Sequence, residues 1–506
     1  MQRTRRLLAL GASLWSVAAW AGPTTTPSFD PADPPQGLFD EAWFAVMLQG
    51  QKAGYLYTAH KREDDLIKSR AFTWIAMRRG EVGIEMNADL VVRETLDGQP
   101  LGYEHTLKMA AKTIRTEATI RDGTLRYTRT TSGQTTRATA DWPDGAKLVW
   151  GLYLLSRRQG CRPGTTIEAV SVDPMLDPAK GVALTTVYQD RETVDLFGRQ
   201  VEAIRAATTI KLDGVSLTSR QWVDEQGDLL ILEQPIGALS FRMVRCAKEF
   251  ALAPARSPEL FVSTMVPLDR PLDKETAKQI TYRLSLEPQD GQVATLSIPA
   301  TDMQSPTPLP DGSVRLAVRR RPESMPAPAS QPAAPKQYLG STVYLNWDDP
   351  AVRAMGDEGA GDATDPAAIA ERLTHYVHKA VAAKGLNVGF ATASEVARSR
   401  EGDCSEHAVL LAALGRAKGI PSRVVSGLVY VREFRGKRHM LGYHMWTQFW
   451  IAGRWLDMDA SHDQVRPDPT HIALSTHALA DGDLARAGLA LIQVIGRLNV
   501  EVLASE

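Results

Sequence analysis

Hydrophobic and polar residues alternate along much of the segment from about Trp43 to Val244. The runs 113–120 and 124–130 alternate in this way, and Asp122-Gly123 between them is a strong signal for a two-residue hairpin. The same signal recurs at Asp97-Gly98, Asp213-Gly214 and Gln226-Gly227. The pattern predicts successive hairpins in one antiparallel sheet, wrapped into a barrel-like or sandwich-like β-rich domain over residues 40–250.

A second, smaller β-rich module is expected over residues 255–321, with strands near 279–286, 293–298 and 313–318. Pro alternates with Ala and Ser from about Pro322 to Pro335. This composition favours an extended chain and cannot build a core, so residues 322–337 are predicted to be a linker.

Beyond Tyr338 the pattern changes to mixed helix and strand, which predicts a third domain over residues 338–506. Thr364-Asp365-Pro366 is typical of a helix start, and apolar residues follow it at helical spacing. Thr392 to Glu395 forms a second capping pattern that opens a short helix toward Arg400. The predicted fold class is therefore multidomain, with a β-rich N-terminal half followed by an α+β domain.

The first residues are typical of an export signal. Arg3, Arg5 and Arg6 precede an apolar stretch from Leu7 to Trp20, and Ala19-Trp20-Ala21 offers a small-x-small cleavage site. A membrane anchor is the alternative, but the stretch is shorter than the roughly 20 residues a bilayer requires. We expect residues 1–21 to be a signal peptide and the protein to be periplasmic or secreted, without a membrane span in the mature chain. The paired arginines leave the export route open.

Net charge and cysteine count limit the partners and the redox state that the chain can have. The 506 residues carry a formal net charge of -1, so no basic field would attract nucleic acid. The odd count of cysteines, Cys161, Cys246 and Cys404, leaves at least one free thiol in an oxidising compartment. Sequence does not decide whether Cys161 and Cys246 pair.

The strongest candidate for chemistry is Cys404. It follows Asp403, which can cap a helix whose box is closed by Glu406, and Gly419 and Pro421 mark the helix end. At the first helical position the backbone N–H groups favour a thiolate, although the two nearby carboxylates oppose it. A histidine partner is therefore expected. The alternative for Cys404 is a buried core cysteine.

Two strands downstream supply that partner. A turn at Ala452-Gly453 would pair Trp450 with Trp455 and extend to Trp446 opposite Asp459. His444 and Asp459 then lie on one face as diagonal neighbours, whereas a three-residue loop would separate them. Taken singly, His444 could be a core histidine and Asp459 a helix cap. His407 is expected to be structural, and Trp446 either packs or donates its indole N–H.

Several segments together resemble the core of the bacterial transglutaminase-like superfamily. They are Gly402 to Ala408, Arg416 to Arg423, His444-Met445-Trp446 and Trp455 to Ser461. The resemblance implies a papain-like α+β fold over about 338–506, with Cys404 as nucleophile, His444 as base and Asp459 orienting the histidine. The family usually shows His-Ala-Trp and Asp-Pro-Thr where this chain has His444-Met445-Trp446 and Asp459-Ala460-Ser461. Neither departure removes a catalytic side chain.

The expected function is thiol-dependent acyl chemistry on an amide of a peptide, protein or cell wall, ending in transfer or hydrolysis. A cysteine peptidase or cell-wall amidase is the nearest alternative. A non-catalytic periplasmic binding or assembly protein is the other class. In it the papain-like core serves as a peptide-binding platform, and the β-rich half carries the role and binds a protein partner. No cofactor and no metal are expected, because the Cys, His and Asp lack the short spacings of a zinc site.

Overall fold

The structure is a computed structural model that describes residues 29–79, 82–109, 112–131, 133–174, 177–212, 215–236, 239–258, 264–288, 296–322, 335–383, 391–480 and 494–506. The expected signal peptide, most of the expected linker and the Asp213-Gly214 turn lie outside these ranges. The chain divides into two compact units, one within residues 10–260 and one within 261–506.

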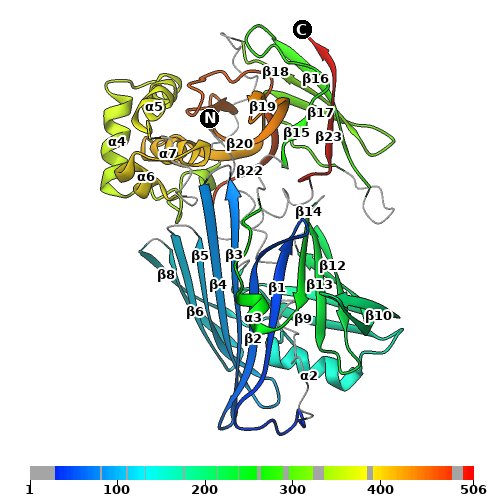
Figure 1. Cartoon of the computed structure of the whole chain (residues 1–506). Coiled ribbons are helices and arrows are strands. Elements are labelled where there is room, and N and C mark those ends of the chain that lie inside the picture. The colour runs from blue at the N-terminus through cyan, green and yellow to red at the C-terminus, as the bar shows by residue number, and fades with distance from the viewer. Residues whose placement is uncertain are drawn as a thin grey trace. The chain divides into compact units, whose positions relative to one another are not determined.

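The N-terminal unit is built on one antiparallel sheet in the order β8-β7-β6-β5-β4-β3-β2-β1-β14-β13-β12-β11-β10-β9. Sequence neighbours pair along two meanders, and β1 joins β14 to unite them (Figure 1). The strands are β1 Gly37–Leu48, β2 Gln51–Glu63, β3 Leu66–Arg79, β4 Val82–Thr95, β5 Pro100–Met109, β6 Lys112–Arg121, β7 Thr124–Thr131, β8 Gln134–Asp141, β9 Thr166–Val172, β10 Gly181–Leu196, β11 Arg199–Leu212, β12 Val215–Val223, β13 Leu229–Ile236 and β14 Leu239–Arg245. The predicted β-rich, antiparallel N-terminal half is confirmed.

Turn chemistry explains the register of these hairpins. Asp122 and Gly123 adopt φ angles of 49° and 71°, which fit a two-residue turn that matches strand twist. Arg121 consequently pairs with Thr124, and the alternation continues to Thr131 opposite Ile114.

A helix, α2 (Val149–Gln159), packs against β3, β4 and β9. It has no side-chain cap of its own at Leu148. Instead the buried Glu94 of β4 accepts hydrogen bonds from the backbone N–H groups of Trp150 (2.6 Å) and Gly151 (2.9 Å). The sheet thereby satisfies the helix N-terminus and fixes where the helix starts. The short helix α3 (Lys248–Leu252) follows β14.

The C-terminal unit joins helices to two sheets. Its helices are α4 Pro350–Ala360, α5 Pro366–Ala380, α6 Ala393–Ser399 and α7 Cys404–Ala417, after a short turn η3 Lys336–Tyr338. One sheet has the order β15-β20-β19-β22, with β21 also paired to β20. Its strands are β15 Val266–Pro267, β19 Ser422–Phe434, β20 Lys437–Ile451, β21 Arg454–Met458 and β22 Ile472–His477. The buried apolar face of α7 packs on β20 and β19, which matches the predicted α+β domain.

The small module shares its sheet with a strand that follows the candidate site in the sequence. β16 (Gln279–Leu286), β17 (Gln304–Pro308) and β18 (Val314–Arg319) form a four-stranded sheet whose fourth member is β23 (Leu498–Ser505). The described part of the expected strand 293–298 is irregular, and β17 takes the place beside β18. The described residues of 264–321 and 338–506 thus belong to one compact unit, a long-range pairing that local alternation cannot reveal.

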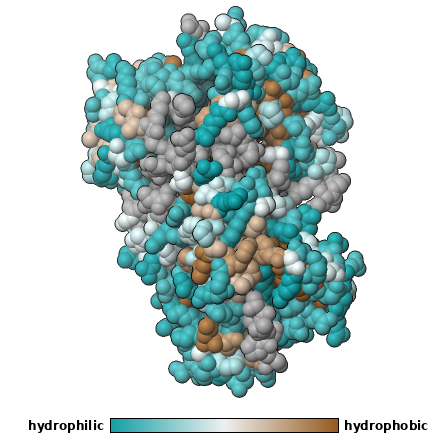
Figure 2. Space-filling view, in the orientation of Figure 1, coloured by the Kyte–Doolittle hydropathy of each residue, from teal (hydrophilic) through white to brown (hydrophobic). Residues whose placement is uncertain are grey.

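Cys161, Cys246 and Cys404 are not joined by a disulfide. Hydrophilic side chains cover most of the face in Figure 2, and hydrophobic side chains gather on part of the N-terminal unit. Within the described ranges, none of the helices has the length and hydropathy needed to cross a bilayer.

Candidate active site

Cys404 is the first residue of α7, as the sequence predicts. The Asp403 carboxylate accepts a hydrogen bond from the Ser405 backbone N–H at 2.9 Å. The Glu406 carboxylate accepts one from the Asp403 backbone N–H at 3.0 Å. This reciprocal box fixes the helix start. Cys404 is 2% exposed, so the thiol sits at a helix N-terminus that is shielded from bulk solvent.

The predicted hairpin register brings His444 and Asp459 together. Ala452 and Gly453 form the turn with φ angles of 50° and 81°, and Trp450 pairs with Trp455. The pairing runs as far as Thr447 opposite Met458. Asp459 then leaves the strand and bridges to Gln464, and its carboxylate reaches His444 from this turn.

The hydrogen bond between His444 and Asp459 is short and buried. His444 Nε2 lies 2.8 Å from Asp459 Oδ2, and both side chains are 1% exposed. Because Nε2–H donates to the Asp459 carboxylate in this hydrogen bond, Nδ1 is the ring nitrogen that can accept a proton. Cys404 belongs to the same apolar cluster as Met445, Met458 and Ala460, the neighbours of His444 and Asp459. The three sequence-predicted residues therefore border or belong to one hydrophobic cluster.

The turn after β21 satisfies the other carboxylate oxygen. Asp459 Oδ1 accepts from the Ser461 backbone N–H (2.8 Å), the Ser461 hydroxyl (2.7 Å) and the His462 N–H (3.3 Å). The departure from Asp-Pro-Thr therefore retains a hydroxyl that holds the aspartate.

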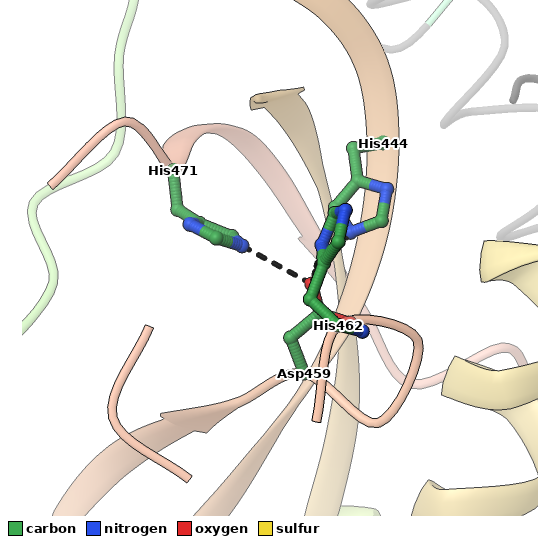
Figure 3. A group of neighbouring side chains, drawn as sticks. All are labelled: His444, Asp459, His462 and His471. Carbon is green, nitrogen blue, oxygen red and sulfur yellow. Dashed lines mark hydrogen bonds and ion pairs between the residues drawn. The ribbon is translucent and has the colours of Figure 1, made fainter. Parts of the chain in front are cut away.

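Two further histidines contact the same carboxylate and were missed from the sequence. His462 Nδ1 lies 2.6 Å from Asp459 Oδ2, and His471 Nε2 lies 3.1 Å from it. Figure 3 shows His444, His462 and His471 around Asp459. His462 could have been noticed at three residues past Asp459, whereas His471 arrives from a separate loop and gives no local signal.

The ionisable side chains of this cluster have their pKa values shifted in different directions. Burial would raise the pKa of Asp459, but His444 and His462 outweigh it and hold that pKa well below its usual range. Burial disfavours a charged His471, yet Asp468 and the bond to Asp459 raise its pKa to about 10. Burial lowers the pKa of His444 to about 4 despite Asp459. At neutral pH the cluster holds a carboxylate, an imidazolium at His471 and a neutral His444 with one ring nitrogen open to a proton.

The small sheet holds the loop that carries His471. Gln304 donates to the Ala473 carbonyl and accepts from the Ala473 N–H, both at 2.9 Å. The Tyr282 hydroxyl donates to the Pro469 carbonyl at 3.1 Å. The module at 279–319 therefore positions a residue of the candidate site.

His407 and Trp446 make structural contacts. His407 is buried with its Nδ1 2.7 Å from the Asp403 carbonyl, and its pKa is lowered, chiefly by burial. The Trp446 indole donates to Asp457 at 2.5 Å, while its ring stacks beside His444 with centroids 6.1 Å apart. Trp446 thus both packs and donates, with its N–H directed to a carboxylate.

A family model matches part of the C-terminal unit. Residues 353–460 match the model of the transglutaminase-like superfamily. The segment contains Cys404, His444 and Asp459, so the resemblance read from the motifs is confirmed. A comparison with curated proteins finds no match.

Solved structures give weaker likenesses. A beta-barrel-like protein of a domain of unknown function from Brucella abortus is 12% identical, covering 42% of this chain and 98% of its own, with a TM-score of 0.32. A cysteine protease candidate from Cytophaga hutchinsonii is 15% identical, covering 45% of this chain and 86% of its own, with a TM-score of 0.27. At these scores neither likeness bears on the function proposed below.

Proposed function

We propose that this protein is an exported transglutaminase-like cysteine enzyme that acts on amide bonds of peptides, proteins or cell-wall material through an acyl-thioester. The observation that carries the proposal is the buried 2.8 Å bond between His444 Nε2 and Asp459, beside the hydrophobic cluster that also contains Cys404 at the start of α7. The match of residues 353–460 to the transglutaminase-like superfamily supports it.

The reaction follows from the polarity of these groups. The Cys404 thiol passes its proton to His444 Nδ1, and the thiolate sulfur forms a bond to the substrate carbonyl carbon. The Cys404 backbone N–H belongs to the first turn of α7 and can donate to the oxyanion. His444 returns the proton to the departing amine as the C–N bond breaks, which leaves the thioester.

A second nucleophile completes the cycle. Water or an amine gives a proton to His444 and attacks the thioester, and Cys404 regains a proton as its sulfur leaves. Asp459 keeps the histidine in the tautomer that each step requires. Whether water or an amine resolves the thioester depends on access to the site.

Site-resolved alkylation tests the proposal. The purified protein is treated with iodoacetamide across pH, and each cysteine is followed by mass spectrometry in wild type, His444→Ala and Asp459→Ala. We expect Cys404 to react well below the ordinary thiol pKa of about 8.5 and to lose that reactivity without His444. Cys246 is an internal reference, because burial raises its pKa to about 11.

Other outcomes would favour the non-catalytic binding protein. A Cys404 that stays inert in the folded wild type but reacts after denaturation would contradict the catalytic assignment. The same holds if its reactivity is equal in all three proteins. If the assignment stands, a glutamine peptide offered with and without a primary amine separates transfer from hydrolysis, and a peptide library separates both from peptidase action.

A further inference from the structure

Four side chains of the candidate site point one ligand atom each toward a common point. His444, Asp459, His462 and His471 contribute three imidazole nitrogens and a carboxylate oxygen, all within 4.8 Å of one another (Figure 3). A Cys-His-Asp triad needs only one histidine on its aspartate. The two additional imidazoles call for a separate explanation.

The spacing of these atoms is near that of a metal site. Tetrahedral zinc with ligands at about 2.0–2.1 Å holds neighbouring ligand atoms roughly 3.4 Å apart. The three nitrogens lie 2.6 to 3.1 Å from Asp459 Oδ2. An ion would therefore push the oxygen outward by a few tenths of an ångström and draw the most distant nitrogens inward.

The surroundings of His471 match those of a metal ligand. Its Nδ1 lies 3.1 Å from the Asp468 carbonyl and 3.5 Å from the Asp468 carboxylate, which orients Nε2 toward the cluster. Asp468 is itself held by Thr470 and Gln464. A carboxylate behind a histidine is the usual outer support of a zinc ligand.

His462 gives the cluster an approach from solvent. Its side chain is 31% exposed, whereas those of His444, Asp459 and His471 are 1% exposed or less. An ion can bind His462 first and then reach the three buried ligands.

We infer that His444, Asp459, His462 and His471 form a binding site for a divalent transition-metal ion, best matched by Zn²⁺, and that the bound ion silences the enzyme. Three imidazoles and one carboxylate are a ligand set that Zn²⁺ and its first-row neighbours accept. The ion takes the Nε2 atom and the carboxylate oxygen that join His444 to Asp459. His444 then holds its remaining proton on Nδ1 and cannot accept one from Cys404.

Metal binding needs only the geometry of the cluster, while the silencing rests on the proposed function. The sequence expectation of no metal considered Cys404, His444 and Asp459 alone. The additional ligands come from the turn after β21 and from the loop before β22, which the fold brings together.

Direct binding of Zn²⁺ and Co²⁺ to the full chain tests the site. Calorimetry with Zn²⁺ and absorption spectra with Co²⁺ are recorded for wild type, Cys404→Ser, His462→Ala and Asp468→Asn. We expect one tight site that Cys404→Ser retains, with no thiolate-to-cobalt charge-transfer band. His462→Ala should weaken binding at least about tenfold, and Asp468→Asn by about 10–100-fold.

A surface histidine supplies the control. His375 also contacts an aspartate, with Nδ1 2.6 Å from Asp463, but both side chains are well exposed. His375→Ala should bind the metal as wild type does. Equal binding by wild type and His462→Ala, loss of binding in Cys404→Ser, or no binding at all would overturn the site.

Silencing is read from alkylation. Stoichiometric Zn²⁺ should slow iodoacetamide labelling of Cys404 in wild type at least about tenfold, and chelation should restore it. His462→Ala should need correspondingly more Zn²⁺. If Zn²⁺ binds tightly and labelling is unchanged, the silencing is wrong and the site stands. If labelling never depends on His444, the proposed function fails independently of the metal.

Discussion

Replacing His471 with Gln should remove a pH-dependent part of the stability of the C-terminal unit. His471 is buried between two carboxylates, which raise its pKa from 6.5 to about 10. Because the folded pKa is raised, the stabilisation is fully present below about pH 6.5 and is lost as pH rises through about 10. A shift of this size corresponds to roughly 5 kcal/mol at most, since each pKa unit is worth about 1.4 kcal/mol.

The measured effect should be smaller than that ceiling. Gln keeps one hydrogen-bond donor for Asp459 or Asp468, and the two aspartates can protonate or recruit water in the variant. We therefore expect His471→Gln to lower the free energy of unfolding by about 2–4 kcal/mol at pH 7, and by much less at pH 10.5.

The assay must measure unfolding of the C-terminal unit separately from unfolding of the N-terminal unit. Each protein is equilibrated in urea at several pH values, and a brief hydrogen-exchange pulse at one fixed pH then reports unfolding through peptides of β20. His375→Gln removes the exposed bond to Asp463 and should change stability by less than about 0.5 kcal/mol. The reasoning is refuted if the difference between wild type and His471→Gln is under about 1 kcal/mol at pH 7, or does not shrink with pH.

Three other substitutions test separate parts of the fold. Gly427→Ala should destabilise the C-terminal unit by about 3 kcal/mol or more, because the new Cβ would lie 2.0 Å from a backbone carbonyl of β22. Gly340→Ala, where the Cβ meets nothing within 4 Å, is the control, and equal urea midpoints for the two would contradict this. Gln304→Leu leaves both backbone groups of Ala473 unpaired, so amide exchange in residues 468–473 should accelerate at least about tenfold, and unchanged exchange would refute the positioning role. Asp40 has its pKa raised to about 8, chiefly by burial, so its stabilisation is present below pH 3.8 and lost as pH rises through about 8. Asp40→Asn should flatten the fall in stability of the N-terminal unit over that window in urea titrations, and a slope equal to that of wild type would count against the burial argument.

Local signals predicted the parts of the site that depend on neighbours in the chain. The box of Asp403 and Glu406 places Cys404 at a helix start, and the turn at Ala452-Gly453 sets the register of His444. Both depend on a few hydrogen bonds within one element or one hairpin, which residue types specify directly.

The missed parts depend on contacts between distant segments. His471 contacts Asp459, and Gln304 holds the backbone of Ala473 two residues further on; neither His471 nor Gln304 belongs to a motif. Likewise, the pairing of β16 with β23 closes a loop of more than two hundred residues. Local periodicity shows that each strand exists and which face is apolar, but it does not choose among distant partners.

The pairing of β16 with β23 also orders events as the chain folds. A chain leaving the ribosome presents Cys404, His444 and Asp459 before β23 follows. Until β23 pairs with β16, the sheet whose side chains hydrogen-bond to the His471 loop lacks one of its four strands. Cys404 is therefore synthesised well before the last strand of this sheet, so we expect the His471 loop to become ordered only after β23 has been made.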